Sequence, residues 1–220
     1  IMACYTDGTQ IVLGYGGYEP RKGLLNKIIR FDTLTIAMQY MGWAKAGHPY
    51  MGVGRNMSYT RSIFFEKNGF QSHYYLMSGD DDLFVNERAT KRNTRIATSS
   101  ESRTLSIPCE SFAQWVSQKK RHLSTWTYYR LGTKIILSYE LMSRLLFYAV
   151  LIVAIYPFGL YIEAAAAFGF RMLVQMLVYK LNMRKFGERG FLFLIPIFDI
   201  VLPILQTAFN ILILRDKRSQ

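Results

Sequence analysis

The sequence has little cysteine and little acid. Only two cysteines, Cys4 and Cys109, occur among 220 residues, and neither has another metal ligand at zinc-site spacing. We therefore expect no disulfide framework and no zinc site, and we interpret both thiols as idle. The chain also has no internal repeat and no low-complexity tract, which argues against a repeat architecture. Its 15 acids stand against 27 lysines and arginines, a net charge of +12.

Long apolar runs are absent from the first part of the chain, where charged and turn residues interrupt every such run up to about residue 140. Three apolar segments follow: 145–162, which has no charge; 164–181, which carries Arg171, Gln175 and Lys180; and 191–214, which carries only Asp199. About 20 apolar residues cross a bilayer core of roughly 30 Å. We therefore predict a membrane region over residues 131–220 with two or three hydrophobic helices.

Basic residues flank these segments and predict their orientation. They are Lys119, Lys120, Arg121, Arg130 and Lys134 before the first segment, and Lys180, Arg184, Lys185 and Arg189 at the end of the second. The positive-inside rule puts both groups in the cytoplasm, so we expect a hairpin.

The third apolar segment leaves two topologies open. The tail "RDKRSQ" is also basic, so the segment either breaks into a re-entrant pair near Pro196, Asp199 and Pro203 or spans the membrane simply. A carboxylate is costly in a bilayer, which makes Asp199 a functional or a packing residue. A polar lining of a re-entrant turn is the interpretation we favour.

Residues 1–130 alternate strand-like and helix-like patterns, which is typical of an α/β domain. "QIVLGYG" (10–16) predicts a buried strand followed by a glycine-rich turn, and its spacing does not match a phosphate-binding loop. The next segments predict an amphipathic helix over 22–44, a glycine-punctuated loop and short helix over 48–70, a polar helix and short strand over 86–100, and an amphipathic helix over 111–130. The last of these carries Trp115, Trp126, Tyr128 and Tyr129, as expected near a membrane interface. We expect the abrupt N-terminal start to reflect a truncated sequence.

Two short motifs carry candidate chemistry. In "SGDDDLFVN" (78–86), Asp80, Asp81 and Asp82 follow a strand-like run, "HYYLM". Such a cluster binds a hard cation, accepts a proton or caps the next helix. In "QKKRH", helical spacing puts Gln118, Arg121 and His122 on one face and turns Lys119 away. Arginine is a natural clamp for a diphosphate, although a basic interfacial helix also binds anionic lipid heads.

In this order, these motifs resemble the C-terminal half of a membrane-bound, processive-type family 2 glycosyltransferase, over about residues 10–180. "GDDDLF" is similar to the family's "EDxDL" base motif, "QKKRH" is similar to "QxxRW", and "PYMGVGRNMSYTRSIFF" is similar to its glycine-rich acceptor-side loop. The resemblance implies a partial GT-A domain over 1–130 followed by membrane helices. His122 stands where the family has tryptophan, and Gly79 stands where glutamate is common.

The resemblance also implies roles for individual residues. Asp80 aligns with the catalytic base, and Asp81 is the alternative. The substrate-binding candidates are Gly52, Gly54, Arg55, Asp82, Gln118, Arg121 and His122. The implied reaction inverts the anomeric carbon as a sugar moves from a nucleotide-sugar donor to a saccharide or lipid-linked acceptor at the cytoplasmic membrane face. The family's divalent cation, magnesium or manganese, is held by a "DxD" motif that in the family precedes the region where this chain begins, and we find no such motif upstream of the acidic cluster.

Two other function classes compete with this interpretation. One is a non-catalytic membrane anchor or transporter component that presents its basic helices to lipid. The other is nucleic-acid binding, which the net charge suggests. The cations cluster beside the apolar segments, where the positive-inside rule already explains them, so we expect membrane lipids as partners and no nucleic acid. His48 is another candidate contact, although a loop histidine before proline is more often structural.

Overall fold

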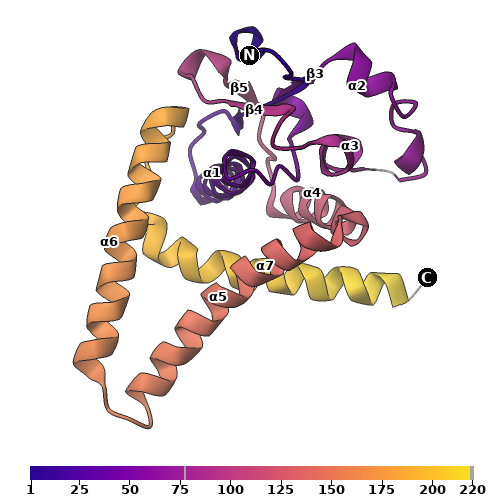
Figure 1. The fold of residues 1–220 in the computed structure, drawn as a ribbon. Coiled ribbons are helices and arrows are strands. Elements are labelled where there is room, and N and C mark those ends of the chain that lie inside the picture. Colours follow the sequence, from indigo (N-terminus) through magenta and orange to yellow (C-terminus); the bar gives the residue numbers. More distant parts are fainter. Residues whose placement is uncertain (77, 219–220) are drawn as a thin grey trace. The chain divides into compact units, whose positions relative to one another are not determined.

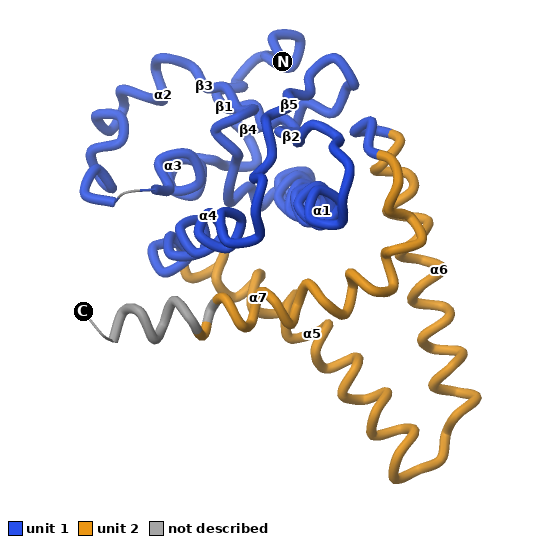
Figure 2. Tube along the Cα trace, turned by 180° about the vertical axis from the view of Figure 1, so that it is seen from behind, with its two compact units in different colours: residues 1–130, 185–188 blue, residues 131–184, 189–220 orange. Residues whose placement is uncertain are grey.

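The computed structural model describes residues 1–76 and 78–218, with the side chains of residues 210 and 212–218 left undescribed. The chain divides into two compact units (Figure 2). Unit 1 contains Ile1–Arg130 and Lys185–Glu188, and unit 2 contains Leu131–Arg184 and Arg189–Gln220. The mixed helix–sheet character predicted for the fold is confirmed.

Unit 1 is built on short strands with helices beside them (Figure 1). Its strands are β1 (Ile11–Gly14), β2 (Gly16–Tyr18), β3 (Met57–Tyr59), β4 (Thr94–Ala97) and β5 (Thr104–Ser106). Its α-helices are α1 (Leu24–Lys45), α2 (Arg61–Phe65), α3 (Asp80–Arg88) and α4 (Phe112–Ser124). Its 3-10 helices are η1 (Met2–Cys4), η2 (Gly54–Asn56), η3 (Gln71–His73), η4 (Ser100–Ser102) and η5 (Thr125–Tyr128).

Strand β1 lies at the centre of a three-stranded sheet of order β3-β1-β4, antiparallel to β3 and parallel to β4. Ile11, Val12 and Leu13 are fully buried, which explains why the strand is apolar at every position rather than alternating. The predicted strand is therefore confirmed. The glycine-rich turn predicted after it is wrong, because Gly16–Tyr18 is a second strand paired in parallel with β5.

Helix α1 buries one face against β2 and β4 and confirms the predicted amphipathic helix. Its buried apolar residues include Ile29, Leu34, Ala37 and Tyr40, at helical spacing. The Tyr40 hydroxyl donates to the Gly14 carbonyl at 2.6 Å, which ties the helix to the end of β1. The same helix also buries Asp32, a charge that apolar packing alone does not explain.

The strand predicted from "HYYLM" is wrong. Residues 71–73 form the 3-10 helix η3, and Tyr74 and Tyr75 are 86% and 70% exposed. Aromatic β-propensity produced that prediction, but propensity reflects packing on a half-buried sheet, and the described residues of this segment, 73–76, belong to no sheet. The acids also do not sit at a strand end, because Asp80, Asp81 and Asp82 form the first turn of α3. Carboxylates are favoured there by the helix dipole.

Unit 2 contains α5 (Leu131–Ile155), α6 (Tyr161–Phe186, whose last residues belong to unit 1), η6 (Leu192–Leu194) and α7 (Ile195–Arg218). Three of its stretches are long and apolar enough to cross a membrane: Leu131–Ile155, Tyr161–Phe186 and Leu192–Phe209. This confirms the prediction of apolar C-terminal helices.

The predicted boundaries of the first apolar helix are wrong. Helix α5 starts at Leu131, and a turn containing Pro157 and Gly159 interrupts the predicted segment 145–162. Gly159 has a φ of +64°, a conformation that glycine adopts without a steric penalty. A hydropathy average does not register such a turn, because its other residues are apolar.

The described backbone of the third segment is one helix, not a re-entrant pair. Pro196 lies in the first turn of α7, where no intrahelical N–H is lost, and Pro203 is accommodated inside the helix. The basic tail falls on residues whose side chains are not described.

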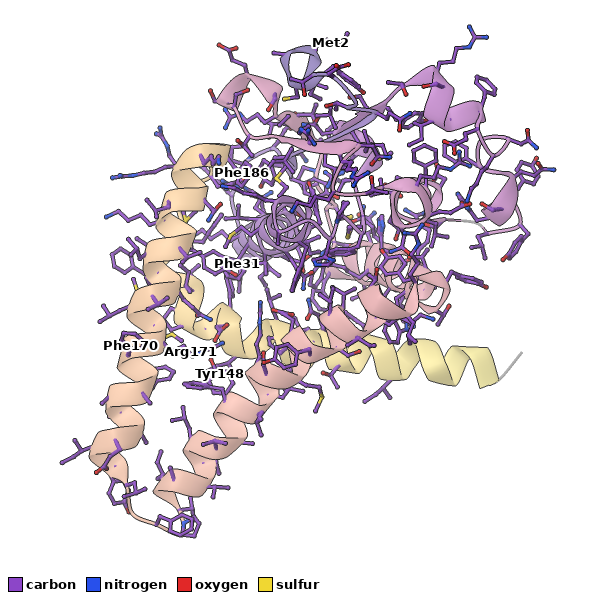
Figure 3. All side chains as sticks on the ribbon, viewed as in Figure 1. Met2, Phe31, Tyr148, Phe170, Arg171 and Phe186 are labelled. Atoms are coloured by element: carbon purple, nitrogen blue, oxygen red, sulfur yellow. The ribbon has the colours of Figure 1, made fainter. Side chains whose placement is uncertain are left out.

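Asp199 of α7 contacts the other two long helices of unit 2, α5 and α6, and is 5% exposed. Its carboxylate accepts hydrogen bonds from Tyr148 of α5 at 2.5 Å, from Arg171 of α6 at 3.0 Å and from Gln175 of α6 at 2.8 Å. Tyr148 and Arg171 are labelled in Figure 3. The lining of a re-entrant turn is therefore the wrong interpretation of Asp199, because four side chains form one polar cluster between helices.

The short segment Lys185–Glu188 returns to unit 1 after α6. The Phe186 ring lies 4.7 Å from that of Tyr15, and Arg103 donates to the Phe186 carbonyl at 3.1 Å. Glu188 is 5% exposed and accepts from Arg30 Nε at 2.9 Å and from the Tyr15 hydroxyl at 2.8 Å. The chain therefore leaves unit 1 after Arg130 and re-enters it after two long apolar helices.

Candidate functional site

Residues from three distant parts of the sequence meet beside the N-terminus of α3. The backbone N–H of Gly54, in the glycine-rich loop, donates to Asp81 Oδ2 at 2.6 Å. The neighbouring Arg55 shares a cavity with Gln118 and His122 of α4. At the end of α4, the Thr125 hydroxyl donates to Asp82 Oδ2 at 2.8 Å. The loop therefore contacts the acids and shares a cavity with the "QKKRH" helix, all within unit 1.

The three acids have three different environments. Asp80 is exposed, and its carboxylate has no hydrogen-bond partner among the described residues. Asp81 is half-buried and accepts two backbone N–H bonds, from Gly54 and from Asp82 at 2.9 Å. Asp82 is 5% exposed. Of the three, Asp80 is free to approach a ligand, Asp81 holds the loop and Asp82 holds the end of α4.

Asp82 is a buried carboxylate with incomplete pairing. Its Oδ2 accepts from Thr125 and, at 2.6 Å, from Tyr129, whereas its Oδ1 is buried without a partner within the described part of the chain. Burial raises the pKa of Asp82 to about 6, and hydrogen bonds from Tyr129 and Thr125 oppose that rise. Gly79 precedes the cluster with a φ of +99°, and a Cβ there would lie 2.5 Å from the Thr125 methyl group. The glycine that departs from the family pattern is therefore required by this packing.

Asp82→Asn is predicted to leave unfolding stability at pH 7 unchanged or increased. The folded protein raises the pKa of Asp82 above its unfolded value, so the protonated form is favoured and stability falls as pH rises from about 4 to about 6. Asparagine keeps an oxygen for Thr125 and Tyr129 and removes the desolvated charge. Thermal unfolding measured from pH 4 to 8 should show a flatter profile for the variant. A large loss of stability at pH 7 would contradict this account of Asp82.

A cavity of about 110 Å³ lies between α1, α4 and the glycine-rich loop. Its aromatic and charged walls are formed by Tyr18, Asp32, Tyr40, Arg55, Trp115, Lys119 and His122, and Gln118 is also part of the lining. Gln118 Nε2 donates to the Tyr18 hydroxyl at 3.2 Å. The Arg55 guanidinium lies 4.1 Å from the centre of the Tyr18 ring and donates to the Gly17 carbonyl at 3.0 Å. The cavity is thus lined by rings, one guanidinium and several hydrogen-bonding groups.

The face of α4 that lines the cavity differs from the predicted one. Trp115, Gln118, Lys119 and His122 line it, whereas Arg121 is exposed and is not part of the lining. The prediction that Lys119 points elsewhere is wrong, because its ammonium group pairs with the buried Asp32 of α1. The buried Trp115 is the signal that distinguishes the two faces, since Lys119 lies four residues after it and Arg121 lies six.

His122 lines the cavity close to the acids. Desolvation by its neighbours lowers the pKa of its imidazole, and the negative charge of Asp81 opposes that shift. The ring is therefore favoured in its neutral form, in which it both donates and accepts hydrogen bonds. This leaves a polar ring where the family resemblance expects tryptophan.

The remaining predicted residues have structural contacts. Gly52 is buried, and a Cβ there would lie 2.9 Å from Leu13 and 3.2 Å from Val85, so the site requires glycine for close packing. His48 is exposed, with its ring 6.2 Å from that of Trp43. Further residues contribute contacts to the site that the sequence motifs did not identify: Tyr18, Asp32, Lys119, Thr125 and Tyr129.

No group of three metal-ligating side chains occurs among the described residues. The acids of α3 point to different partners, as their hydrogen bonds show, and do not converge on one point. A divalent cation remains an expectation from the family resemblance and is not assigned to residues of this chain.

No protein-family model matches the chain, and a comparison with curated proteins finds no match either.

Proposed function

We propose that this chain is the acceptor-side and membrane portion of an inverting glycosyltransferase that uses a nucleotide sugar. The observation that carries the proposal is that the loop at 52–55 hydrogen-bonds to the acids of α3 and lines one cavity together with the α4 face. In the sequence, these motifs matched a family pattern only as separate strings. Their meeting in space is what a shared substrate site requires.

Asp80 acts as the general base in this proposal. An acceptor hydroxyl attacks the anomeric carbon as its proton passes to the Asp80 carboxylate. The bond from that carbon to the diphosphate oxygen breaks, and the nucleoside diphosphate leaves. A single displacement of this kind inverts the anomeric centre. Asp80 suits the role because it is exposed and unbonded among the described residues, whereas both oxygens of Asp81 already accept backbone N–H groups.

Arg55 takes over the role that the sequence assigned to Arg121. Charge on the leaving diphosphate needs a fixed cation nearby, and a guanidinium is the side chain best suited to phosphate oxygens. Arg55 lines the cavity and is held there by Tyr18 and the Gly17 carbonyl, whereas Arg121 is exposed. The magnesium or manganese ion expected from the family would supply further positive charge at the diphosphate.

The acceptor is a saccharide or a lipid-linked saccharide, and the reaction takes place at the cytoplasmic membrane face. The three apolar stretches of α5, α6 and η6–α7 are long enough to anchor the protein there. Anionic lipid heads favour the nearby cations.

The direct test is transfer by membranes that contain the complete gene product, supplied with a panel of nucleotide sugars. We expect release of nucleoside diphosphate and incorporation of sugar with at least one donor. A protein that is folded in the membrane and transfers from none of them would favour the non-catalytic anchor.

The membrane hairpin makes a separate prediction. Because Lys185–Glu188 belongs to the same unit as Ile1–Arg130, we propose that both ends of the α5–α6 pair lie on one side of the bilayer. After replacement of the native cysteines by serine, Lys185→Cys should react only with reagent supplied from the cytoplasm. Tyr156→Cys, at the exposed turn between the helices, is the matched control and should react only from the opposite side. Labelling of both from one side would overturn the hairpin.

A further inference from the structure

The cavity contains a buried ion pair that the proposed mechanism does not use. Asp32 of α1 pairs with Lys119 of α4, and their side chains are 4% and 15% exposed. Desolvating two charges often costs about as much as their attraction returns, so apolar residues of similar size often hold two helices equally well. A charged pair at this position therefore points to a role beyond packing.

The position of the pair points to a ligand. Both residues line the cavity, together with three aromatic side chains, Tyr18, Tyr40 and Trp115. Pockets for drug-sized ligands are typically about 300–1,000 Å³. A cavity of about 110 Å³ is far below that range and takes one edge of a single ring, with the rest of the ligand outside it.

The charge balance of the pair selects the ligand class. A phosphate or carboxylate that paired with Lys119 would leave the Asp32 carboxylate buried without its cation. A ligand cation that paired with Asp32 would likewise leave the Lys119 ammonium group without its anion. Either loss is strongly unfavourable in a buried site. A neutral polyhydroxyl ring avoids this penalty, because adjacent hydroxyls donate to the carboxylate and accept from the ammonium group while the pair stays intact.

From these observations we infer that Asp32 and Lys119 are specificity-determining residues for a neutral pyranose ring bound in this cavity. The paired charges hydrogen-bond to its hydroxyls, and the apolar C–H face of the ring lies against the aromatic walls. The inference rests on the proposed transferase function for the identity of the ligand as a substrate sugar. Anionic sugars, such as uronic acids, are excluded by the same charge balance.

Binding to the complete protein in detergent, with Asp32 and Lys119 both unchanged, tests the ligand class. Trp115 provides the signal once Trp43 and Trp126 are replaced by phenylalanine. Methyl glycosides of neutral hexoses should change its fluorescence in a saturable way, whereas methyl glucuronide and uridine diphosphate should bind at least about tenfold more weakly at the same site. Tighter binding of either anion in competition with the neutral glycosides would overturn the inference.

Variants then test the pair itself. Asp32→Asn and Lys119→Met should each raise the dissociation constant of the neutral glycoside at least about tenfold, the scale of a lost hydrogen bond to a charged group. In transfer assays they should raise KM more than they lower kcat. Lys27→Met, an exposed lysine on the same helix as Asp32, is the matched control and should change neither value.

The outcomes separate this inference from the proposed function. Neutral glycoside binding without transfer from any donor would reject the transferase and leave the binding site standing. Transfer with an unchanged KM in both variants would reject the pair as a specificity determinant and leave the transferase standing. If the single variants unfold, the competition measurement on the protein that keeps both Asp32 and Lys119 still decides the ligand class.

Discussion

Replacement of Asp80 by asparagine is expected to lower sugar transfer about 100-fold or more while nucleotide-sugar binding stays close to wild type. Asparagine keeps the size of the side chain and removes the charge that accepts the proton, and general-base catalysis typically contributes about 10²–10⁴-fold. Binding should survive because the Asp80 side chain makes no hydrogen bond to the loop or to α4 among the described residues. Initial rates and donor affinity, measured on the complete protein in membranes, check both parts.

The neighbouring acids are the matched controls for Asp80. Asp82→Asn should retain most of the activity, because its amide oxygen still accepts from Thr125 and Tyr129. Asp81→Asn should have an intermediate effect, since it weakens the bond that holds the Gly54 N–H. If Asp80→Asn transferred sugar normally and Asp81→Asn did not, the base would be Asp81, the alternative left by the motif alignment. Normal transfer by both would make the cluster a solvated helix cap.

Glu188→Gln is expected to lower the free energy of unfolding of unit 1 by about 3–5 kcal/mol. The pair with Arg30 is almost fully buried, with side chains 3% and 9% exposed, and replacing the carboxylate removes a close counter-charge from the buried guanidinium. The variant also weakens the bond from the Tyr15 hydroxyl. Denaturant unfolding of the purified protein in detergent measures the loss.

Two further variants test whether the expected loss of stability comes from the burial of the charge rather than from the loss of any ion pair. Glu110→Gln breaks an ion pair with Arg21 whose carboxylate side chain is 78% exposed, and it should change stability by less than about 1 kcal/mol. Combining Glu188→Leu with Arg30→Met should recover much of the loss, because the double variant buries no isolated charge. Equal effects of Glu188→Gln and Glu110→Gln would show that Lys185–Glu188 is not docked in unit 1.

The elements that the sequence predicted correctly are those with one dominant local signal. Strand β1 is an apolar run with burial on both faces, and α1 has apolar residues at helical spacing. Helix α4 begins with a capping box at Ser111 and Gln114, which fixes its start independently of tertiary contacts. The apolar stretches of unit 2 are visible from hydropathy alone, although their boundaries are not.

The errors occur where a distant residue decides between local alternatives. The local pattern of "QKKRH" is compatible with a cavity-facing side of α4 that carries either Arg121 or Lys119. Lys119 faces the cavity because it pairs with Asp32, which is far away in the sequence. The docking of Glu188 against Tyr15 has no local signal at all, since the acid stands in a basic loop after α6. Asp199 was recognised as costly in a bilayer, but its partners on α5 and α6 were not predictable from its own segment.

The anomeric configuration of the product tests the central claim most directly. The proposed mechanism uses one base, Asp80, and therefore predicts a single displacement. Product made by the complete protein from an α-linked nucleotide sugar should therefore carry a β-linkage, read from the anomeric proton coupling in its NMR spectrum. An α-linked product would require a second displacement and a nucleophile that this account does not provide, and it would contradict the assignment of Asp80 as the base of an inverting transfer.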